Sequence, residues 1–356
     1  MSKILKYLLL GLLAFLLVIL CYFFIGKAPQ QKEITWGISF SQKHAKDLGL
    51  DWKETYLSSL DDLEVKNLRL ITHWDLIEPK KDKYIFDDLE WQIKEAEKRE
   101  IKIILVIGMK TPRWPECHIP DWAEGLNREE REKEILGLLK EIVLKYQNSN
   151  SIISWQIENE PFFEFGECPE IREDFLKQEI DLVKSLDPHT KRGQDAEGVK
   201  INEVSPRYGV GVDTNHRKII ITESGTGSFW FKGAELGDIV GISLYRKVWF
   251  HKPKIYVSYP SPAIFYWRKA QIIQRLFNKE VICAELQTEP WGPVLLYDLS
   301  LEEQKKTMDL ERFRENIAFA EKTGLKEFYL WGVEWWFWLK TQQNQPEIWQ
   351  EAKKLF

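Results

Sequence analysis

The chain has 356 residues, enough for one large domain or two small ones, and its length does not choose between them. Hydrophobic residues make up 44% and charged residues 29%, a composition that is typical of a globular protein and excludes a disordered chain. The formal net charge is −5 at pH 7, so the charge balance gives no reason to expect a nucleic-acid partner. The sequence is rich in tryptophan, with 16 residues, and these large rings either fill a core or line a binding surface.

The N-terminal segment "YLLLGLLAFLLVILCYFFIG", Tyr7 to Gly26, contains 20 residues without a charge, and lysines flank it on both sides. This length spans the hydrocarbon core of a bilayer. It is long for the apolar region of a signal peptide, and no small-residue cleavage site follows it. We therefore expect residues 1–26 to form an uncleaved membrane anchor, followed by a polar linker over 27–33 and an extracytoplasmic domain. The alternative is a cleaved signal peptide, which would leave a secreted protein.

Two of the four cysteines, Cys117 and Cys168, fall in loops that follow predicted strands. Outside the cytoplasm this pair can form a disulfide, and we state that pairing as a hypothesis. Cys21 lies in the N-terminal apolar segment. Cys283 lies in an apolar strand-like run, where a buried free thiol is expected.

After residue 33, short β-rich runs alternate with longer segments that have helical spacing. A strand-then-helix pattern repeated eight times predicts a (β/α)8 barrel, or TIM barrel, over residues 34–356. A doubly wound open sheet is the structural alternative, but no glycine-rich dinucleotide-binding motif follows the first strand. The predicted strands are Ile34–Phe40, Asn67–Thr72, Ile101–Gly108, Ser151–Glu158, Lys218–Glu223, Ile239–Tyr245, Val281–Leu286 and Glu327–Gly332.

The clearest predicted helix runs from Arg128 to Tyr146, where apolar residues recur on one face. Asn127 precedes it and Glu130 follows three residues later, which is the spacing of a capping box. The connection after the fifth strand is short, and the polar, glycine-containing residues 193–217 form a predicted insertion before that strand. Further helices are predicted over Arg172–Leu186, Ala263–Phe277 and Leu301–Lys322.

In a barrel of this type the active site gathers at the C-terminal ends of the strands. Two candidates there, Glu160 and Glu285, are carboxylates at the ends of the fourth and seventh predicted strands, on nearly opposite sides of the barrel. Glycoside hydrolysis needs such a pair, because one carboxyl protonates the leaving oxygen and the other acts from the opposite face of the sugar. The other candidates at these ends are Arg69, His73, Trp114, His118, Asn159, Tyr245, Glu289, Trp291, Trp331 and Glu334.

The two carboxyls of such a pair must differ, since the acid needs a raised pKa and the nucleophile must stay ionised. Arg69 would keep a neighbouring nucleophile charged, and the Tyr245 hydroxyl would hydrogen-bond to it and orient it. Glu289 and Glu334 are interpreted as contacts to sugar hydroxyls or as supports for the catalytic pair. Candidates for substrate contacts at the mouth are Trp114, His118, Trp291 and Trp331, although the tryptophans are also explained by ordinary aromatic packing.

The stretches "WQIENEP" (Trp155 to Pro161) and "AELQTEPW", together with Arg69 and Trp331, resemble clan A glycoside hydrolases, and most closely the cellulase-type enzymes of glycoside hydrolase family 5. The resemblance covers nearly the whole chain after the N-terminal segment. It implies that Glu160 is the acid/base, that Asn159 contacts the sugar 2-hydroxyl and that Glu285 is the nucleophile. It also implies retention of configuration through a covalent glycosyl-enzyme. The pattern departs from family 5 after the third and fifth predicted strands, where the usual histidines are absent.

Glu158 and Glu160 lie on the same face of a strand, so alternation does not say which one is the acid/base. We select Glu160, because Pro161 restricts the residue before it to an extended conformation at the C-terminal end of the strand. Glu158 lies one step deeper. We expect it to support the site through an ion pair, with an arginine as the candidate partner.

The sequence therefore predicts a membrane-anchored, extracytoplasmic retaining β-glycosidase that acts on an oligo- or polysaccharide and needs no cofactor. No metal site is expected, because His73 and His118 lack the spacing of metal ligands. A transglycosylase that remodels a surface glycan would use the same two carboxylates and stays an alternative. A non-catalytic carbohydrate-binding barrel is a second alternative.

Overall fold

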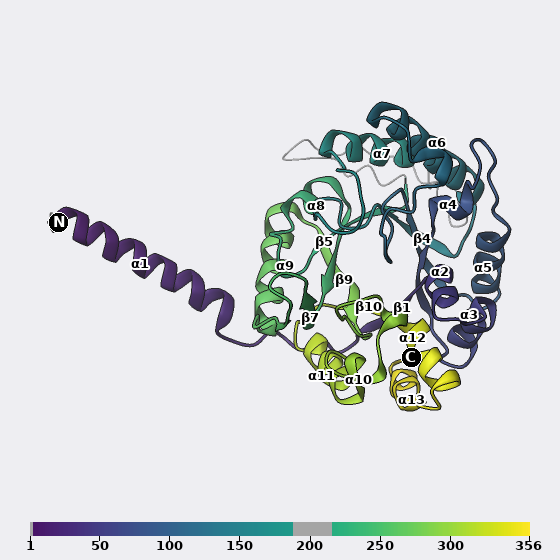
Figure 1. Ribbon diagram of the computed structural model, residues 1–356. Helices are drawn as coiled ribbons and strands as arrows, with labels where there is room; N and C mark the ends of the chain where they lie inside the picture. Colours follow the sequence, from purple (N-terminus) through teal and green to yellow (C-terminus); the bar gives the residue numbers. More distant parts are fainter. Residues whose placement is uncertain (1–2, 188–215) are drawn as a thin grey trace, which may run out of the picture.

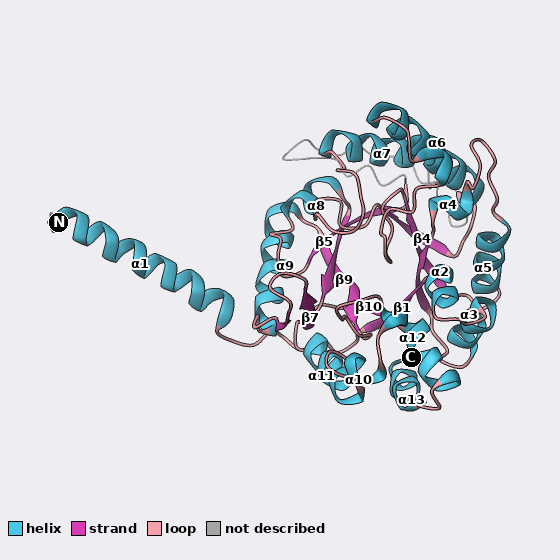
Figure 2. Cartoon of the chain, viewed as in Figure 1, coloured by secondary structure: helices cyan, strands magenta, loops and turns pink. Residues whose placement is uncertain are grey.

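The computed structural model of the protein describes residues 3–187 and 216–356 (Figure 1). Eight parallel strands close into a barrel, with helices around the outside (Figure 2), so the TIM-barrel prediction is confirmed. Each strand bound lies within one residue of its prediction. The barrel strands, in order around the barrel, are β1 (Thr35–Phe40), β2 (Asn67–Ile71), β3 (Lys102–Ile107), β4 (Ile152–Ile157), β5 (Lys218–Ser224), β6 (Ile239–Leu244), β9 (Glu280–Gln287) and β10 (Glu327–Trp331), which pairs with β1.

Helix α6 (Arg128–Tyr146) has the predicted bounds and the predicted capping box, in which Asn127 and Glu130 exchange side-chain to backbone hydrogen bonds of 3.0 Å each. The connection after β5 is short, as expected, since it holds only α8 (Phe231–Leu236). A hairpin of β7 (Lys247–Phe250) and β8 (Ile255–Ser258) follows β6. Apart from two residues at its end, the predicted insertion over 193–217 lies outside the described residues. The other helices that follow the predicted pattern or cover the barrel are α2 (Gln42–Asp47), α3 (Trp52–Asp61), α4 (Trp74–Ile77), α5 (Asp87–Glu97), α7 (Glu173–Leu186), α9 (Ala263–Phe277), α12 (Val333–Gln342) and α13 (Glu347–Ala352).

The prediction of one helix over Leu301–Lys322 is wrong, because the chain forms α10 (Leu301–Gln304) and a separate α11 (Leu310–Glu321). Asp309 starts α11 by accepting a hydrogen bond from the N–H of Arg312 at 2.8 Å. In the break, the Thr307 hydroxyl accepts a hydrogen bond from the N–H of Trp291 at 3.0 Å. This contact ties the break to the loop after β9, a long-range constraint that the periodicity of the segment does not carry.

The N-terminal helix α1 (Lys3–Phe24) is long and apolar enough to cross a membrane, and it extends away from the barrel beside α9 (Figure 1). The rings of Phe23 and Phe24 contact Phe265 on α9, with centroid distances of 5.8 and 5.7 Å. Farther along, Gln31 donates a side-chain hydrogen bond to the carbonyl oxygen of Gly324 at 2.8 Å. A helix of this kind fits a signal peptide as well as an anchor, so the division of the chain at residues 26 and 33 stays a prediction.

The barrel interior near the starts of the strands is filled by Tyr329 and four isoleucines. Gly37 on β1 leaves the room that Tyr329 needs, because a Cβ atom there would lie 2.7 Å from the tyrosine ring and 2.8 Å from the carbonyl oxygen of Asn67. This hydrophobic layer thus depends on a residue without a side chain. The polar candidate residues lie beyond the layer, toward the C-terminal ends of the strands. The isoleucines of this layer are Ile104, Ile220, Ile239 and Ile282.

We expect Gly37→Ala to lower the free energy of unfolding by about 1–3 kcal/mol, the usual cost of an extra methyl group in a packed core. Gly125→Ala is the control, since its Cβ would meet nothing within 4 Å, and it should change the stability by less than about 0.5 kcal/mol. Urea unfolding followed by tryptophan fluorescence measures both variants. Equal stability of the two would contradict the packing argument.

Candidate active site

Glu285, near the end of β9, is buried and held by one donor at each carboxylate oxygen. Arg69 on β2 donates from Nη1 to Oε1 at 2.9 Å, and Tyr245, which directly follows β6, donates its hydroxyl to Oε2 at 3.1 Å. Burial raises the pKa of Tyr245 well above its ordinary value, so its hydroxyl stays protonated and keeps donating. The structure therefore brings Arg69 and Tyr245 to Glu285, as the sequence analysis expects.

Arg69 also connects Glu285 to β4. Its Nε donates to the side-chain oxygen of Gln156 at 2.7 Å, and its Nη2 donates to Oδ1 of Asn159 at 3.1 Å. The arginine is fully buried, and such a charge is tolerated only when its N–H groups are hydrogen-bonded and a counter-charge is close. One guanidinium therefore positions side chains from β2, β4 and β9 at the same end of the barrel.

Glu160 follows β4 and is half-buried. Its carboxylate accepts a hydrogen bond from the Ser243 hydroxyl on β6 at 2.6 Å, and its backbone N–H donates to the Thr222 hydroxyl on β5 at 2.8 Å. Desolvation, and after it the charge of Glu285, raise the pKa of Glu160 to about 7. A substantial fraction of this carboxyl is therefore protonated at neutral pH, as a general acid requires.

The backbone of Glu160 is not extended, so that expectation is wrong. Its φ of 43° lies in the left-handed region, which is unfavourable for a residue with a side chain. Lys110, a buried residue that follows β3, donates from Nζ to the carbonyl oxygens of Glu160 and Phe163 at 3.1 and 2.7 Å. These hydrogen bonds hold the turn and override the preference for extended backbone that Pro161 imposes.

Among the arginines that the structure describes, none forms the expected ion pair with Glu158. Its carboxylate accepts hydrogen bonds from the backbone N–H groups of Met109 and Lys110, at 2.8 and 2.5 Å, where the chain leaves β3. A Cβ atom at Gly108, whose φ is 130°, would lie 2.4 Å from this carboxylate. Burial raises the pKa of Glu158 to about 7 and that of its neighbour Glu179 on α7 well above the ordinary value. Glu158 therefore supports the site by holding the end of β3.

The loop after β3 brings in Arg113, a charged residue that the sequence analysis missed. Arg113 donates hydrogen bonds to Glu289 and, from Nη2 at 2.8 Å, to Glu334. Its guanidinium carbon also lies 3.8 Å from the ring centroid of Trp331. Burial alone would raise the pKa of Glu289, but the charges of Arg113 and His44 lower it to about 2. Glu289 and Glu334 thus hold an arginine against the tryptophan that was expected to carry a sugar ring.

The same loop places Glu116 at the site, a further carboxyl that the sequence analysis missed. Its Oε2 accepts a hydrogen bond from Nδ2 of Asn159 at 3.0 Å. Burial, and after it the charge of Glu285, raise the pKa of Glu116 to about 8. Because Asn159 donates one N–H to Glu116 and accepts from Arg69, its second N–H is the donor left for the predicted contact with a sugar hydroxyl.

A disulfide between Cys117 and Cys168 joins this loop to the loop after β4, with 5.2 Å between the Cα atoms, and confirms the hypothesis from the sequence. Cys283 is a buried free thiol, as expected. Lys110 and Cys117 also form a β-bridge across the base of the loop. In the sequence, Arg113 and Glu116 are visible only as two charges that flank a Trp-Pro pair after a predicted strand.

Three of the residues predicted to contact the substrate, Trp114, Trp291 and His118, lie in two separate parts of the site. Trp291 packs on Tyr245 with a centroid distance of 5.3 Å, and Phe165 links it to Trp114, which is 44% exposed. Trp291 therefore lies beside the Glu285 site, and Trp114 lies farther out, on Phe165. His118 is buried against His73, with ring centroids 4.3 Å apart. Burial, and then the charge of a nearby lysine, lower the pKa of His118 to about 3, so its ring is neutral.

Among the residues that the structure describes, one group of possible metal ligands is found. Ligand atoms of His44, Glu289 and Glu334 lie within 4.8 Å of one another. Arg113 already supplies a positive charge to both of these carboxylates. A metal ion would have to displace this arginine from its two partners, so the donor set is better suited to the guanidinium.

We expect Glu116→Gln to reduce the loss of stability that accompanies a rise in pH from about 5.5 to about 7.5. A carboxyl whose pKa is raised in the folded state binds its proton more tightly there, so the folded state loses stability as the pH rises above the ordinary pKa. Glutamine keeps an oxygen that can accept from Asn159 but does not titrate. Urea unfolding at both pH values measures the effect, with the exposed Glu124→Gln as control. An unchanged pH dependence in Glu116→Gln would contradict the assignment.

Neither a protein-family model nor a curated protein sequence matches the chain. Solved structures match it in fold. One is GH5_18 from Streptomyces cattleya in complex with GlcNAc, with a TM-score of 0.54 and 11% identity over 86% of this chain and 71% of that chain. A second is GH5_18 from Bifidobacterium longum subsp. longum in complex with Manb1-4GlcNAc, with a TM-score of 0.55 and 11% identity over 84% and 68%.

A third structure with this fold is a family 10 endo-beta-1,4-xylanase from Gloeophyllum trabeum. It has a TM-score of 0.52 and 12% identity, and the match covers 84% of each chain. At such low identity the likeness shows the fold and leaves substrate and chemistry open. The chain therefore has the fold of the clan A TIM-barrel glycoside hydrolases, in agreement with the resemblance seen in its sequence.

Proposed function

We propose that the protein is a retaining glycoside hydrolase that cleaves β-glycosidic bonds, with Glu160 as acid/base and Glu285 as nucleophile. The observation that carries the proposal is the unlike environment of these two carboxyls at the C-terminal ends of β4 and β9. Glu285 is paired with Arg69 and oriented by Tyr245, whereas the pKa of Glu160 is raised to about 7. One carboxyl held by an arginine and a second carboxyl with a raised pKa match the needs of this reaction.

In the first step, an oxygen of Glu285 attacks the anomeric carbon while Glu160 gives its proton to the glycosidic oxygen, and the leaving group departs as an alcohol. The new ester bond removes the negative charge of Glu285. Because that charge is one of the two causes that raise the pKa of Glu160, the pKa falls in the glycosyl-enzyme. Glu160 can then take a proton from the water that attacks the anomeric carbon and releases Glu285.

We further propose that α1 anchors the enzyme in a membrane and that the barrel lies outside the cytoplasm. The support is the length and apolar character of α1 and the disulfide of the barrel, a bond that persists in oxidising compartments.

Glu285→Ala should reduce turnover of an activated aryl β-glycoside to the background rate, because no covalent intermediate can form. The measurement is the release of 4-nitrophenol from a panel of 4-nitrophenyl β-glycosides. Glu124→Ala, at an exposed position, is the matched control, and circular dichroism verifies that both variants fold. A near-normal rate for Glu285→Ala would exclude this mechanism.

Glu160→Ala should slow the hydrolysis of alkyl glycosides by about 10²–10⁴-fold, the usual contribution of a general acid. With activated aryl glycosides it should slow the first step much less, because their leaving group departs without a proton. Azide should restore turnover of the aryl glycosides and give a β-glycosyl azide, since azide attacks without a general base. Equal losses on both classes, without rescue, would contradict the assigned role. Product analysis at high acceptor concentration distinguishes hydrolysis from transglycosylation.

A further inference from the structure

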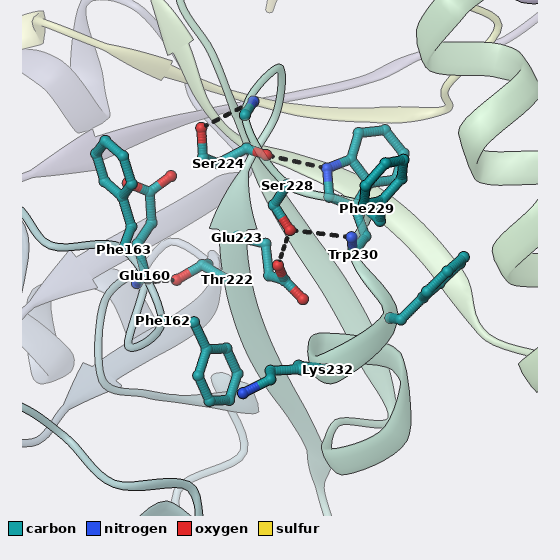
Figure 3. Close-up of a pocket in the computed structure, with 12 residues that line it drawn as sticks. Glu160, Phe162, Phe163, Thr222, Glu223, Ser224, Ser228, Phe229, Trp230 and Lys232 are labelled. Atoms are coloured by element: carbon teal, nitrogen blue, oxygen red, sulfur yellow. Dashed lines mark hydrogen bonds between the residues drawn. The ribbon is translucent and has the colours of Figure 1, made fainter.

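A pocket of about 430 Å³ adjoins Glu160 (Figure 3). Two segments form its walls: the turn after β4, and the loop that leads from the end of β5 into α8. The chemistry described above uses only Glu160 at its edge. Its aromatic lining residues are Phe162, Phe163, Phe229, Trp230 and Phe231.

Three of the five aromatic side chains of the pocket are exposed, whereas Trp230 is buried. Phe229 is 75% exposed, Phe163 46% and Phe231 40%. Phe229 and Phe231 stack with ring centroids 6.0 Å apart, so they present a continuous apolar wall on the β5 side. Phe163 faces the pocket from the β4 side (Figure 3). Exposed rings gathered around one pocket are typical of a surface that a ligand covers.

The polar groups of the pocket, by contrast, have partners within the protein. The Ser228 hydroxyl donates to Glu223 and accepts from the N–H of Trp230 at 3.0 Å (Figure 3). Glu223 also accepts from a backbone N–H of α8 at 2.6 Å, and Ser224 accepts from a loop N–H at 3.3 Å. Lys232 pairs with a glutamate of α7 at 3.0 Å. Lys232, whose side chain is 56% exposed, keeps further N–H donors, but the other polar side chains are buried or half-buried and already hydrogen-bonded. A ligand rich in hydroxyl groups would therefore replace only some of its hydrogen bonds to water here.

From these contacts we infer that the pocket takes the leaving group of the substrate, and that this group is an apolar alkyl or aryl aglycone and not a further sugar. The inference rests on the proposed function: Glu160 protonates the glycosidic oxygen, so the leaving group lies on the side of Glu160. A sugar ring can stack on phenyl rings, but its hydroxyls also need partners, whereas an alkyl or aryl group does not. The expected substrate thus narrows from an oligo- or polysaccharide to a glycoside of an apolar alcohol.

The position of the pocket agrees with an aglycone of this kind. Phe231 contacts Phe277 of α9 with a centroid distance of 5.8 Å, and Phe265 of the same helix contacts the end of α1. The aromatic wall and the proposed anchor therefore contact opposite ends of α9, on one flank of the barrel (Figure 1). An anchor on this flank holds the barrel at the bilayer, where alkyl glycosides concentrate.

The test uses the full chain in phosphatidylcholine vesicles and the β-linked sugar that gives the fastest 4-nitrophenyl glycoside. It compares kcat/KM for the octyl and methyl glycosides of that sugar, because the two alcohols are similar as leaving groups. We expect a ratio of octyl to methyl of about ten or more, since several methylene groups leave water in the pocket. Phe229→Ser, and separately Phe231→Ser, should lower this ratio severalfold.

Leu276→Ser is the matched control, because it removes a side chain that is 68% exposed on α9 and lies outside the pocket. It should keep the wild-type ratio, which separates binding in the pocket from partitioning of the octyl glycoside into vesicles. A second experiment uses a hexadecyl glycoside embedded in the vesicles. Its turnover identifies a membrane glycolipid as the substrate, and turnover of the octyl glycoside alone identifies a water-soluble glycoside.

A ratio near one, or a ratio that both phenylalanine variants leave unchanged, overturns the inference while turnover itself upholds the proposed function. A disaccharide of the same sugar with a higher kcat/KM than the octyl glycoside also overturns it. If no glycoside is turned over, the proposed function fails and the inference fails with it.

Discussion

The buried ion pair between Arg69 and Glu285 is the interaction on which the site depends. Two charges removed from water are stable only when they are close together and their remaining groups are hydrogen-bonded. Arg69 meets this condition by binding Gln156 and Asn159 as well, so side chains from three strands meet at one guanidinium. The charge kept on Glu285 also raises the pKa of Glu160. The same ion pair therefore supports both halves of the proposed chemistry.

Around this pair, the loop after β3 contributes as much to the site as the strands do. Arg113 lies between Glu289 and Glu334 on the face of Trp331, and Glu116 accepts from Asn159. The disulfide after Glu116 ties the loop to the neighbouring connection. Three of the residues expected to touch a sugar are therefore engaged with the protein itself: Glu289, Glu334 and Trp331. The side of the site opposite the aromatic pocket is polar and charged.

Much of the fold follows from local pattern. Each barrel strand was predicted within one residue, because β-rich runs bounded by polar turns mark strands wherever helices separate them. The capping box at Asn127 was predicted from local pattern as well, because it needs only a glutamate three residues after the asparagine. The failures depend on contacts distant in sequence: the helix break near Asp309 is bonded to the loop after β9, and the turn at Glu160 is held by Lys110. Periodicity carries no information about such partners.

For the site, the sequence by itself determined which residues stand at the strand ends. A closed barrel gathers those ends into one ring, so Arg69, Glu160, Tyr245 and Glu285 had to converge once eight strands were recognised. Only the tertiary structure decided how the connecting loops fold over that ring. It placed Arg113 on Trp331, set Glu116 against Asn159 and left the phenylalanines of the β5–α8 loop exposed beside Glu160. Loop conformation is set by long-range pairing and burial, which a linear pattern of residues does not encode.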